Sequence, residues 1–111
     1  MKTIILIPIY NDRESLTKLI ENINSEIEGI NSEISVVVIN DASSQQIIDE
    51  YQNTENINSI KIINMKENRG HARCIASGLK YIFEKKEFDY VIPMDGDGED
   101  RPEEIKNFIQ L

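Results

Sequence analysis

The amino-acid sequence predicts a single α/β domain in which a mainly parallel sheet of four strands is covered by helices on both faces. Short apolar runs rich in β-branched residues recur along the chain, at residues 3–7, 34–39, 60–63 and 90–94. These runs do not alternate with polar residues, which is typical of strands buried on both faces of a parallel sheet. Amphipathic helical patterns lie between the runs. Alternating strands and helices predict right-handed crossovers and parallel pairing.

The first strand is expected over residues 3–7, Thr-Ile-Ile-Leu-Ile, and Pro8 is expected to end it. A helix should follow, because apolar residues recur there at the spacing of one helical face. Asn11 is placed to cap this helix, with Glu14 as its partner three residues later. The apolar residues of the predicted face are Leu16, Leu19, Ile20, Ile23 and Ile27.

The second strand, at residues 34–39, precedes another capping pattern, Ser43 with Gln46. This pattern predicts a second helix, whose apolar residues are Ile47, Ile48 and Tyr51.

The third strand, at residues 60–63, leads to a third helix that should begin after Asn68. Cys74 and Gly78 are interpreted as packing residues on this helix, and Gly78 would allow close approach to a strand. The predicted apolar face of the helix consists of Ala72, Ile75, Leu79, Ile82 and Phe83.

The fourth strand, at residues 90–94, contains a proline and stops at the acidic, glycine-rich residues 95–100. Pro102, followed by Glu103 and Glu104, is typical of the first turn of a helix. The apolar residues of this short last helix are Ile105, Phe108 and Ile109.

The composition limits the class of protein. With 111 residues the chain has room for one domain, residues 1–111, with a small core. A net charge of -8 argues against a nucleic-acid partner, because affinity for phosphate backbones comes largely from Lys and Arg. A single Cys excludes an internal disulfide and fits a reducing compartment. The apolar run at residues 3–7 is too short for a signal sequence or a membrane span, so we expect a soluble, cytoplasmic chain.

The acidic segment indicates a metal site. Asp95, Asp97, Glu99 and Asp100 lie within six residues, and such carboxylates have raised pKa values unless a cation lies among them. Gly96 and Gly98 allow the backbone to turn tightly, so that Asp95 and Asp97 can direct their carboxylate oxygens at one point. Oxygen ligands suit a hard divalent ion, Mg²⁺ or Mn²⁺.

Two other interpretations of the acidic segment were considered. It could be a solvated turn, as most acidic glycine-rich loops are. A calcium loop of the helix-loop-helix type is excluded, because Asp100 stands where Gly is needed and Lys106 where a bidentate Glu is needed.

Ligands of parallel sheets bind beyond the carboxyl ends of the strands, near the point where the strand order reverses. This rule selects four stretches, which begin at Pro8, Asn40, Asn64 and Asp95 and should converge on one edge. Their chemistry suits a nucleotide diphosphate.

Three features of these stretches are relevant to a nucleotide. Asp41 could accept a hydrogen bond from a base N–H or a ribose hydroxyl, or it could simply begin a helix. Arg69 and Gly70 precede a helix whose N–H groups favour anions, and Arg73 lies one turn along it, unless it is merely a surface charge. His71 is interpreted as a solvated side chain rather than a metal ligand, because no second His or Cys is suitably spaced.

Four stretches together resemble, in order and spacing, the amino-terminal half of family 2 glycosyltransferases with the GT-A fold. They are IPIYNDRESL, VVVINDASS, ENRGHARCIASGL and YVIPMDGDGEDRPEEI. The last stretch is similar to polyprenyl-phosphate sugar transferases of the dolichyl-phosphate mannose synthase type. The resemblance implies a Rossmann-like GT-A half-domain with strand order 3-2-1-4. It also implies an inverting transferase that binds a nucleotide sugar, with a UDP or GDP moiety, through a divalent metal.

The resemblance also implies roles for individual residues. Pro8, Tyr10 and Glu14 would shape the base pocket, and Asp41 would contact the base or the ribose. Arg69, Gly70 and Arg73 would face the diphosphate. Asp95, Gly96 and Asp97 match the family's DxD motif. Asp97 would contact the metal directly, Asp95 would contact the ribose or a metal-bound water, and Glu99 would be a further metal ligand.

The chain departs from the family pattern in three places. The common Asp-Asp-Gly-Ser after the second strand reads Asn40-Asp41-Ala42-Ser43, and Cys74 replaces a common Ala. The acceptor-binding region and the general base of the family lie well beyond the DxD motif, whereas the sequence ends at Leu111. We therefore expect a donor-binding portion, truncated before the acceptor region, for which no catalytic base can be named.

Two other functions were weighed against this one. A phospho-receiver domain would need an acceptor Asp at the end of the third strand, where Ile62-Ile63-Asn64-Met65-Lys66 offers none. A non-catalytic nucleotide-binding or regulatory module with the same fold stays open as the alternative.

The resemblance and the truncation also lead to expectations about partners. A membrane would be reached through a lipid acceptor or a missing part, which would place a full-length form at the cytoplasmic face. An exposed fourth strand would favour a homodimer or marginal stability.

Overall fold

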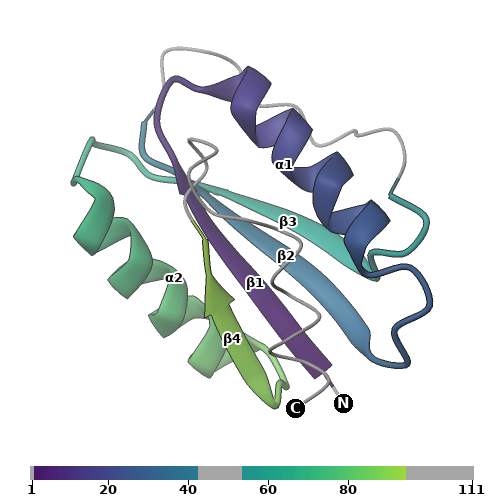
Figure 1. Ribbon diagram of the computed structural model, residues 1–111. Coiled ribbons are helices and arrows are strands. Elements are labelled where there is room, and N and C mark those ends of the chain that lie inside the picture. Colours follow the sequence, from purple (N-terminus) through teal and green to yellow (C-terminus); the bar gives the residue numbers. More distant parts are fainter. Residues whose placement is uncertain (1, 43–53, 95–111) are drawn as a thin grey trace.

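The computed structural model describes residues 2–42 and 54–94 as a parallel sheet with helices packed on it (Figure 1). The strands are β1 (Lys2–Ile9), β2 (Glu33–Asn40), β3 (Ser59–Asn64) and β4 (Tyr90–Pro93). The helices are α1 (Arg13–Glu26) and α2 (His71–Lys85). The helices predicted near Ser43 and Pro102 lie outside the described residues.

The four strands are ordered β3-β2-β1-β4, and every pairing among them is parallel. This confirms the predicted order 3-2-1-4. The chain adds β2 and β3 on one side of β1 and then crosses to add β4 on the other side. The order of the strands therefore reverses between β1 and β4.

Each face of the sheet has its own core, because successive strand residues point to opposite faces. Ile5 and Ile7 of β1 pack with α1, which contributes Leu16 and Ile20 among others. The alternate β1 residues, including Leu6, pack with α2. The prediction of helices on both faces is thus confirmed, and Figure 1 shows α1 and α2 on either side of the sheet.

Burial on both faces, which the apolar runs predicted for all four strands, holds for β1 and β2 only. Residues 3–9 of β1 are all buried, whereas β3 and β4 contain only exposed and half-buried residues. The physical reason is position, because β3 and β4 form the two edges of the described sheet and the described helices pack mainly over its centre.

The prediction that Pro8 ends the first strand is wrong. Pro8 lies within β1 and is paired in register with Ile39. The backbone N–H of Met94 donates to Leu6 O, and that of Asp41 donates to Ile9 O. Even-numbered residues of β1 therefore direct their backbone groups toward β4. Among the described residues the β1–β4 ladder extends only to Leu6, so the missing N–H at Pro8 removes no ladder hydrogen bond there.

The prediction that Asn11 caps α1 is wrong. Asp12 occupies the N-cap position and makes no side-chain cap hydrogen bond, while Asn11 adopts a left-handed conformation with φ of 50°. Asn tolerates this conformation better than most residues, which suits it to the turn between β1 and α1. The predicted apolar face of α1 is confirmed, since its residues are all buried.

The buried stripe of α2 agrees with the predicted one in part. Ile75, Leu79 and Ile82 pack with the sheet as predicted, whereas Ala72 and Phe83 are exposed. Cys74 and Gly78 are also buried on this helix. A Cβ atom built on Gly78 would lie 2.5 Å from Cδ1 of Leu6, so the absence of a side chain lets α2 approach β1 closely. This confirms the interpretation of Cys74 and Gly78 as packing residues.

Neither α1 nor α2 combines the length and the apolar character that a membrane crossing requires, and this statement covers the described residues alone.

Candidate functional site

The carboxyl ends of the strands meet at one edge, as parallel pairing requires. Beyond the strands, the backbone N–H of Asp41 donates to Ile9 O at 2.9 Å, and that of Met65 donates to Asn40 O at 2.8 Å. The N–H of Met94 donates to Leu6 O, also at 2.8 Å. The stretches after β2, β3 and β4 are thus held to neighbouring strands where they leave the sheet.

Asp41 is the most constrained polar residue of this edge. Only 4% of its surface is exposed. Its Oδ1 accepts the backbone N–H of Arg69 at 2.7 Å, and its Oδ2 accepts that of Gly70 at 2.9 Å. Asn68 Nδ2 lies 3.4 Å from the carbonyl oxygen of Asp41. The end of β2 is therefore tied to the turn that precedes α2.

Opposing influences act on the pKa of Asp41. Burial raises it, while hydrogen bonds from the Arg69 N–H, the Cys74 thiol and the Gly70 N–H lower it, and the net shift is downward from the usual value. Burial also raises the pKa of Cys74 to about 12, assisted by its hydrogen bond to Asp41 and by the charge of that carboxylate. At neutral pH the Asp41 carboxylate is thus ionised and the Cys74 thiol is protonated.

Two asparagines form a second polar contact that the sequence analysis did not predict. Asn40 Nδ2 donates to Asn64 Oδ1 at 2.9 Å. These residues are partners in register at the ends of β2 and β3. The signal was present in the sequence, because each of the two apolar runs ends in Asn, but it could be interpreted only once the strands were known to be neighbours.

The other predicted site residues of the described chain lie around the same edge. Pro8 is buried near the end of β1, and Tyr10, just beyond it, is 53% exposed. Glu14 is exposed in the first turn of α1. Arg69 forms an exposed ion pair with Glu67 at 3.1 Å. Arg73 is exposed near the start of α2, as expected for a surface charge or for a ligand contact.

The predicted metal ligands Asp95, Asp97 and Glu99, together with Gly96, lie outside the described residues. Within residues 2–42 and 54–94, no group of three His, Cys, Asp or Glu residues could hold a metal ion. The acidic segment nevertheless begins directly after Met94, whose N–H is bonded to β1. Its carboxylates are hard oxygen donors, the type that Mg²⁺ and Mn²⁺ prefer.

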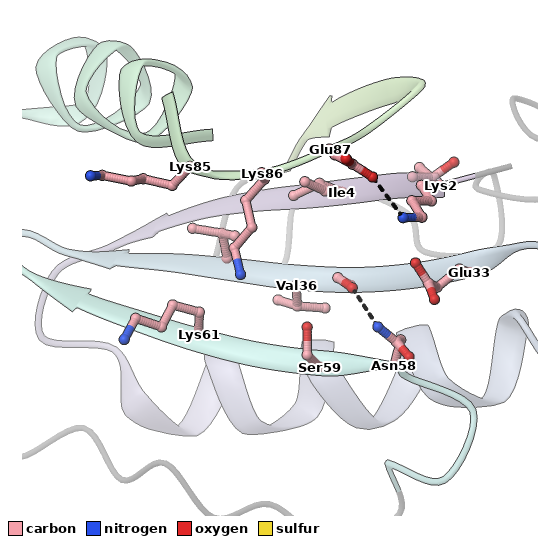
Figure 2. Close-up of a pocket in the computed structure, with 13 residues that line it drawn as sticks. Lys2, Ile4, Glu33, Val36, Asn58, Ser59, Lys61, Lys85, Lys86 and Glu87 are labelled. Atoms are coloured by element: carbon pink, nitrogen blue, oxygen red, sulfur yellow. Dashed lines mark hydrogen bonds and ion pairs between the residues drawn. The ribbon is translucent and has the colours of Figure 1, made fainter. Parts of the chain in front are cut away.

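A cavity of about 270 Å³ lies at the opposite edge of the sheet (Figure 2). It is lined by residues near the start of the strands, such as Lys2, Glu33 and Ser59, and by the end of α2. Figure 2 shows the side chain of Lys86 extending from the end of α2 toward β2. None of the predicted site residues lines this cavity, and we therefore place the candidate site at the carboxyl edge.

The parallel sheet ordered β3-β2-β1-β4, with helices on both faces, is the GT-A-like arrangement. The chain belongs to glycosyl transferase family 2, whose family profile matches residues 4–111.

Two relatives are similar to nearly the whole of this chain. An uncharacterised protein of Methanocaldococcus jannaschii is 24% identical over 110 residues, which cover 96% of this chain and 45% of that protein. The undecaprenyl-phosphate 4-deoxy-4-formamido-L-arabinose transferase of Proteus mirabilis is 31% identical over 111 residues, which cover 97% of this chain and 32% of that enzyme.

Among solved structures, TarS from S. aureus superposes with a TM-score of 0.69 at 24% identity and shows the fold alone. That match covers 97% of this chain and 31% of the TarS chain. The chain therefore spans between about a third and a half of the length of these relatives.

Proposed function

We propose that this chain is the donor-binding portion of an inverting glycosyltransferase, which binds a nucleotide-diphosphate sugar through a divalent metal. One observation carries the proposal. The strand order reverses between β1 and β4, and in the sequence the acidic segment 95–100 comes after β4 and Met94. Ligands of open α/β sheets bind in the crevice at such a reversal.

In this proposal the residues at the end of β1 and just beyond it hold the base. Pro8, Tyr10 and Glu14 would form one wall of the base pocket, with the exposed ring of Tyr10 available for stacking. Arg69 and Arg73, both exposed, would face the diphosphate. The ion pair of Arg69 with Glu67 is no obstacle, because exposed pairs of this kind contribute only about 0–1 kcal/mol.

Asp97 would hold the metal, with Asp95 and Glu99 beside it. A bound Mg²⁺ or Mn²⁺ would act as a Lewis acid that neutralises charge on the departing nucleotide diphosphate. The chain would contribute the position of these carboxylates, because the Met94 N–H bond to Leu6 O fixes where the acidic segment begins.

We further propose that the acceptor is a polyprenyl phosphate, bound by residues outside these 111. The undecaprenyl-phosphate transferase of Proteus mirabilis supports this class of acceptor by its name. A lipid acceptor would place the longer protein at the cytoplasmic face of a membrane. The isolated chain should then bind donor without transferring sugar. Robust turnover by these 111 residues would contradict this division of roles.

Amide NMR would test donor binding directly. The chain would be titrated with UDP and GDP in Mg²⁺, then in EDTA, and again as the Asp97→Ala variant. We expect shifts at Tyr10, Gly70 and residues 95–99 that vanish without metal or without Asp97. Glu33→Ala is the matched control, because Glu33 is an exposed carboxylate at the opposite edge of the sheet. Loss of binding in the control, or the absence of shifts in the folded wild type, would overturn the proposal.

A further inference from the structure

The carboxylate of Asp41 accepts hydrogen bonds from the backbone N–H groups that precede α2. It accepts from Arg69 and from Gly70, one hydrogen bond to each oxygen. The first hydrogen bond of the helix follows immediately, from the Cys74 N–H to the Gly70 carbonyl at 3.1 Å. The chain therefore supplies its own anion at the amino-terminal end of α2, where a helix favours negative charge.

The contact is held under conformational constraint. Gly70 has φ of 86°, and Ala42, next to Asp41, has φ of 56°. Left-handed backbone at a non-glycine residue is strained and persists only where surrounding contacts enforce it. The Ala42 N–H also donates to Asn40 O at 2.9 Å, which tightens the turn after β2. Each side of the contact thus includes a residue with positive φ.

The helix that follows is itself anchored. Cys74, fully buried on α2, packs in the core between this helix and the sheet. Asp41 is therefore bound to the turn that leads into a helix packed on the sheet. A carboxylate that is 4% exposed and already accepts a backbone hydrogen bond on each oxygen is better suited to holding its own chain than to recognising a base.

We propose that Asp41 is a positioning residue that holds residues 68–70 against the end of β2. It thereby places Arg69 and the first turn of α2, with Arg73, at the nucleotide edge. This inference rests on the proposed function for its effect on binding. It replaces direct contact between Asp41 and the base or ribose, which the family resemblance implied.

The hydrogen bonds can be measured in the wild type without any substitution. Couplings across the hydrogen bonds, from the amide nitrogens of Arg69 and Gly70 to Cγ of Asp41, should be detectable by NMR. Their absence in the folded chain would overturn the proposal whatever the chain binds.

The Asp41→Asn variant tests the consequence. Asn offers one acceptor oxygen and a donor group in place of the second oxygen, so one N–H of the turn loses its partner. We expect amide exchange at Arg69 or Gly70 to accelerate at least about tenfold, while amides of β1 and β2 keep their protection. Asp12→Asn is the matched control, because Asp12 lies before α1 at the same edge without a side-chain cap bond, and it should leave these amides unchanged.

Nucleotide binding separates positioning from direct contact. Asp41→Asn should weaken UDP or GDP at least about fivefold and leave the matching nucleoside, uridine or guanosine, unaffected. Equal weakening of nucleotide and nucleoside would show direct contact with the base or ribose and would overturn the inference. If the wild type binds neither UDP nor GDP, the proposed function fails, whereas the couplings and exchange rates still decide whether Asp41 holds the turn.

Discussion

The close approach of α2 to β1 makes Gly78 a sensitive test of the packing. In the Gly78→Ala variant, the new methyl group would lie 2.5 Å from Leu6 Cδ1 and 3.0 Å from Ile39 Cγ1. Both neighbours are fully buried and have little room to move. Replacing Gly by Ala in an open helix would stabilise it by about 1 kcal/mol. Overpacking a core costs about 1–3 kcal/mol.

The cost of overpacking should exceed the gain in helix propensity. We expect the free energy of unfolding to fall by about 1 kcal/mol, because the midpoint of the packing cost exceeds the gain in helix propensity. The melting temperature should fall by roughly 4 °C. Urea denaturation followed by circular dichroism would measure the change.

Two further variants identify the cause. Ala76→Gly, at an exposed position of α2, should lose about 1 kcal/mol through helix propensity alone. Leu6→Val makes room beside Gly78, so in that background Gly78→Ala should cost at least about 0.5 kcal/mol less than in the wild type. If Gly78→Ala instead raises stability by about 1 kcal/mol, as at an open helix site, α2 does not lie this close to β1.

Two other predictions concern the buried thiol and the exposed strand. Because burial raises the pKa of Cys74 from 9.0 to about 12, the folded chain keeps a proton that the unfolded chain loses. Stability should therefore fall as pH rises between these values, more steeply in the wild type than in Cys74→Ala, as urea denaturation at each pH would show. Tyr90, 59% exposed on β4, should contribute to self-association of this edge strand, so Tyr90→Lys should weaken a dimer in sedimentation velocity. A wild type that stays monomeric at every concentration would contradict that expectation.

Strand identity, direction and order were predictable because they depend on properties that the sequence displays. Apolar runs without alternation indicated parallel strands, and the alternation with helices indicated the crossovers. The family resemblance then implied the order. What could not be predicted depends on three-dimensional pairing. Pro8 continues β1 because its ring falls where β4 has ended, which no local pattern reveals.

The errors on the helices have a similar cause. The predicted stripe of α2 wrongly included Ala72 and Phe83, because a periodicity argument counts every apolar residue at helical spacing, whether or not the sheet reaches it. The residues that touch the sheet include Cys74 and Gly78, which are small because the helix lies close. Asn11 was assigned as a cap by its residue type, whereas the turn uses it for its left-handed backbone.

The candidate site was predictable as a location but not as a set of contacts. Placing Asp41, Arg69 and Gly70 at one edge followed from parallel topology. Their mutual hydrogen bonds depend on the neighbouring positions of β2 and β3 and on the conformation of two loops. The roles of Asp95, Asp97 and Glu99 stay predictions.

The pairing of β1 with β4 has a consequence for how the site comes into being. Lys2 and Asp89, which are joined by a hydrogen bond near the start of these two strands, are 87 positions apart in the chain. Closing so long a loop costs more entropy than joining β1 to β2 or β2 to β3, and contacts between distant residues slow folding. We therefore expect β4 to dock after the other three strands have assembled. In the proposed function the metal would be held by residues that follow β4 in the chain, so metal affinity should be acquired last during folding and lost first when β4 detaches.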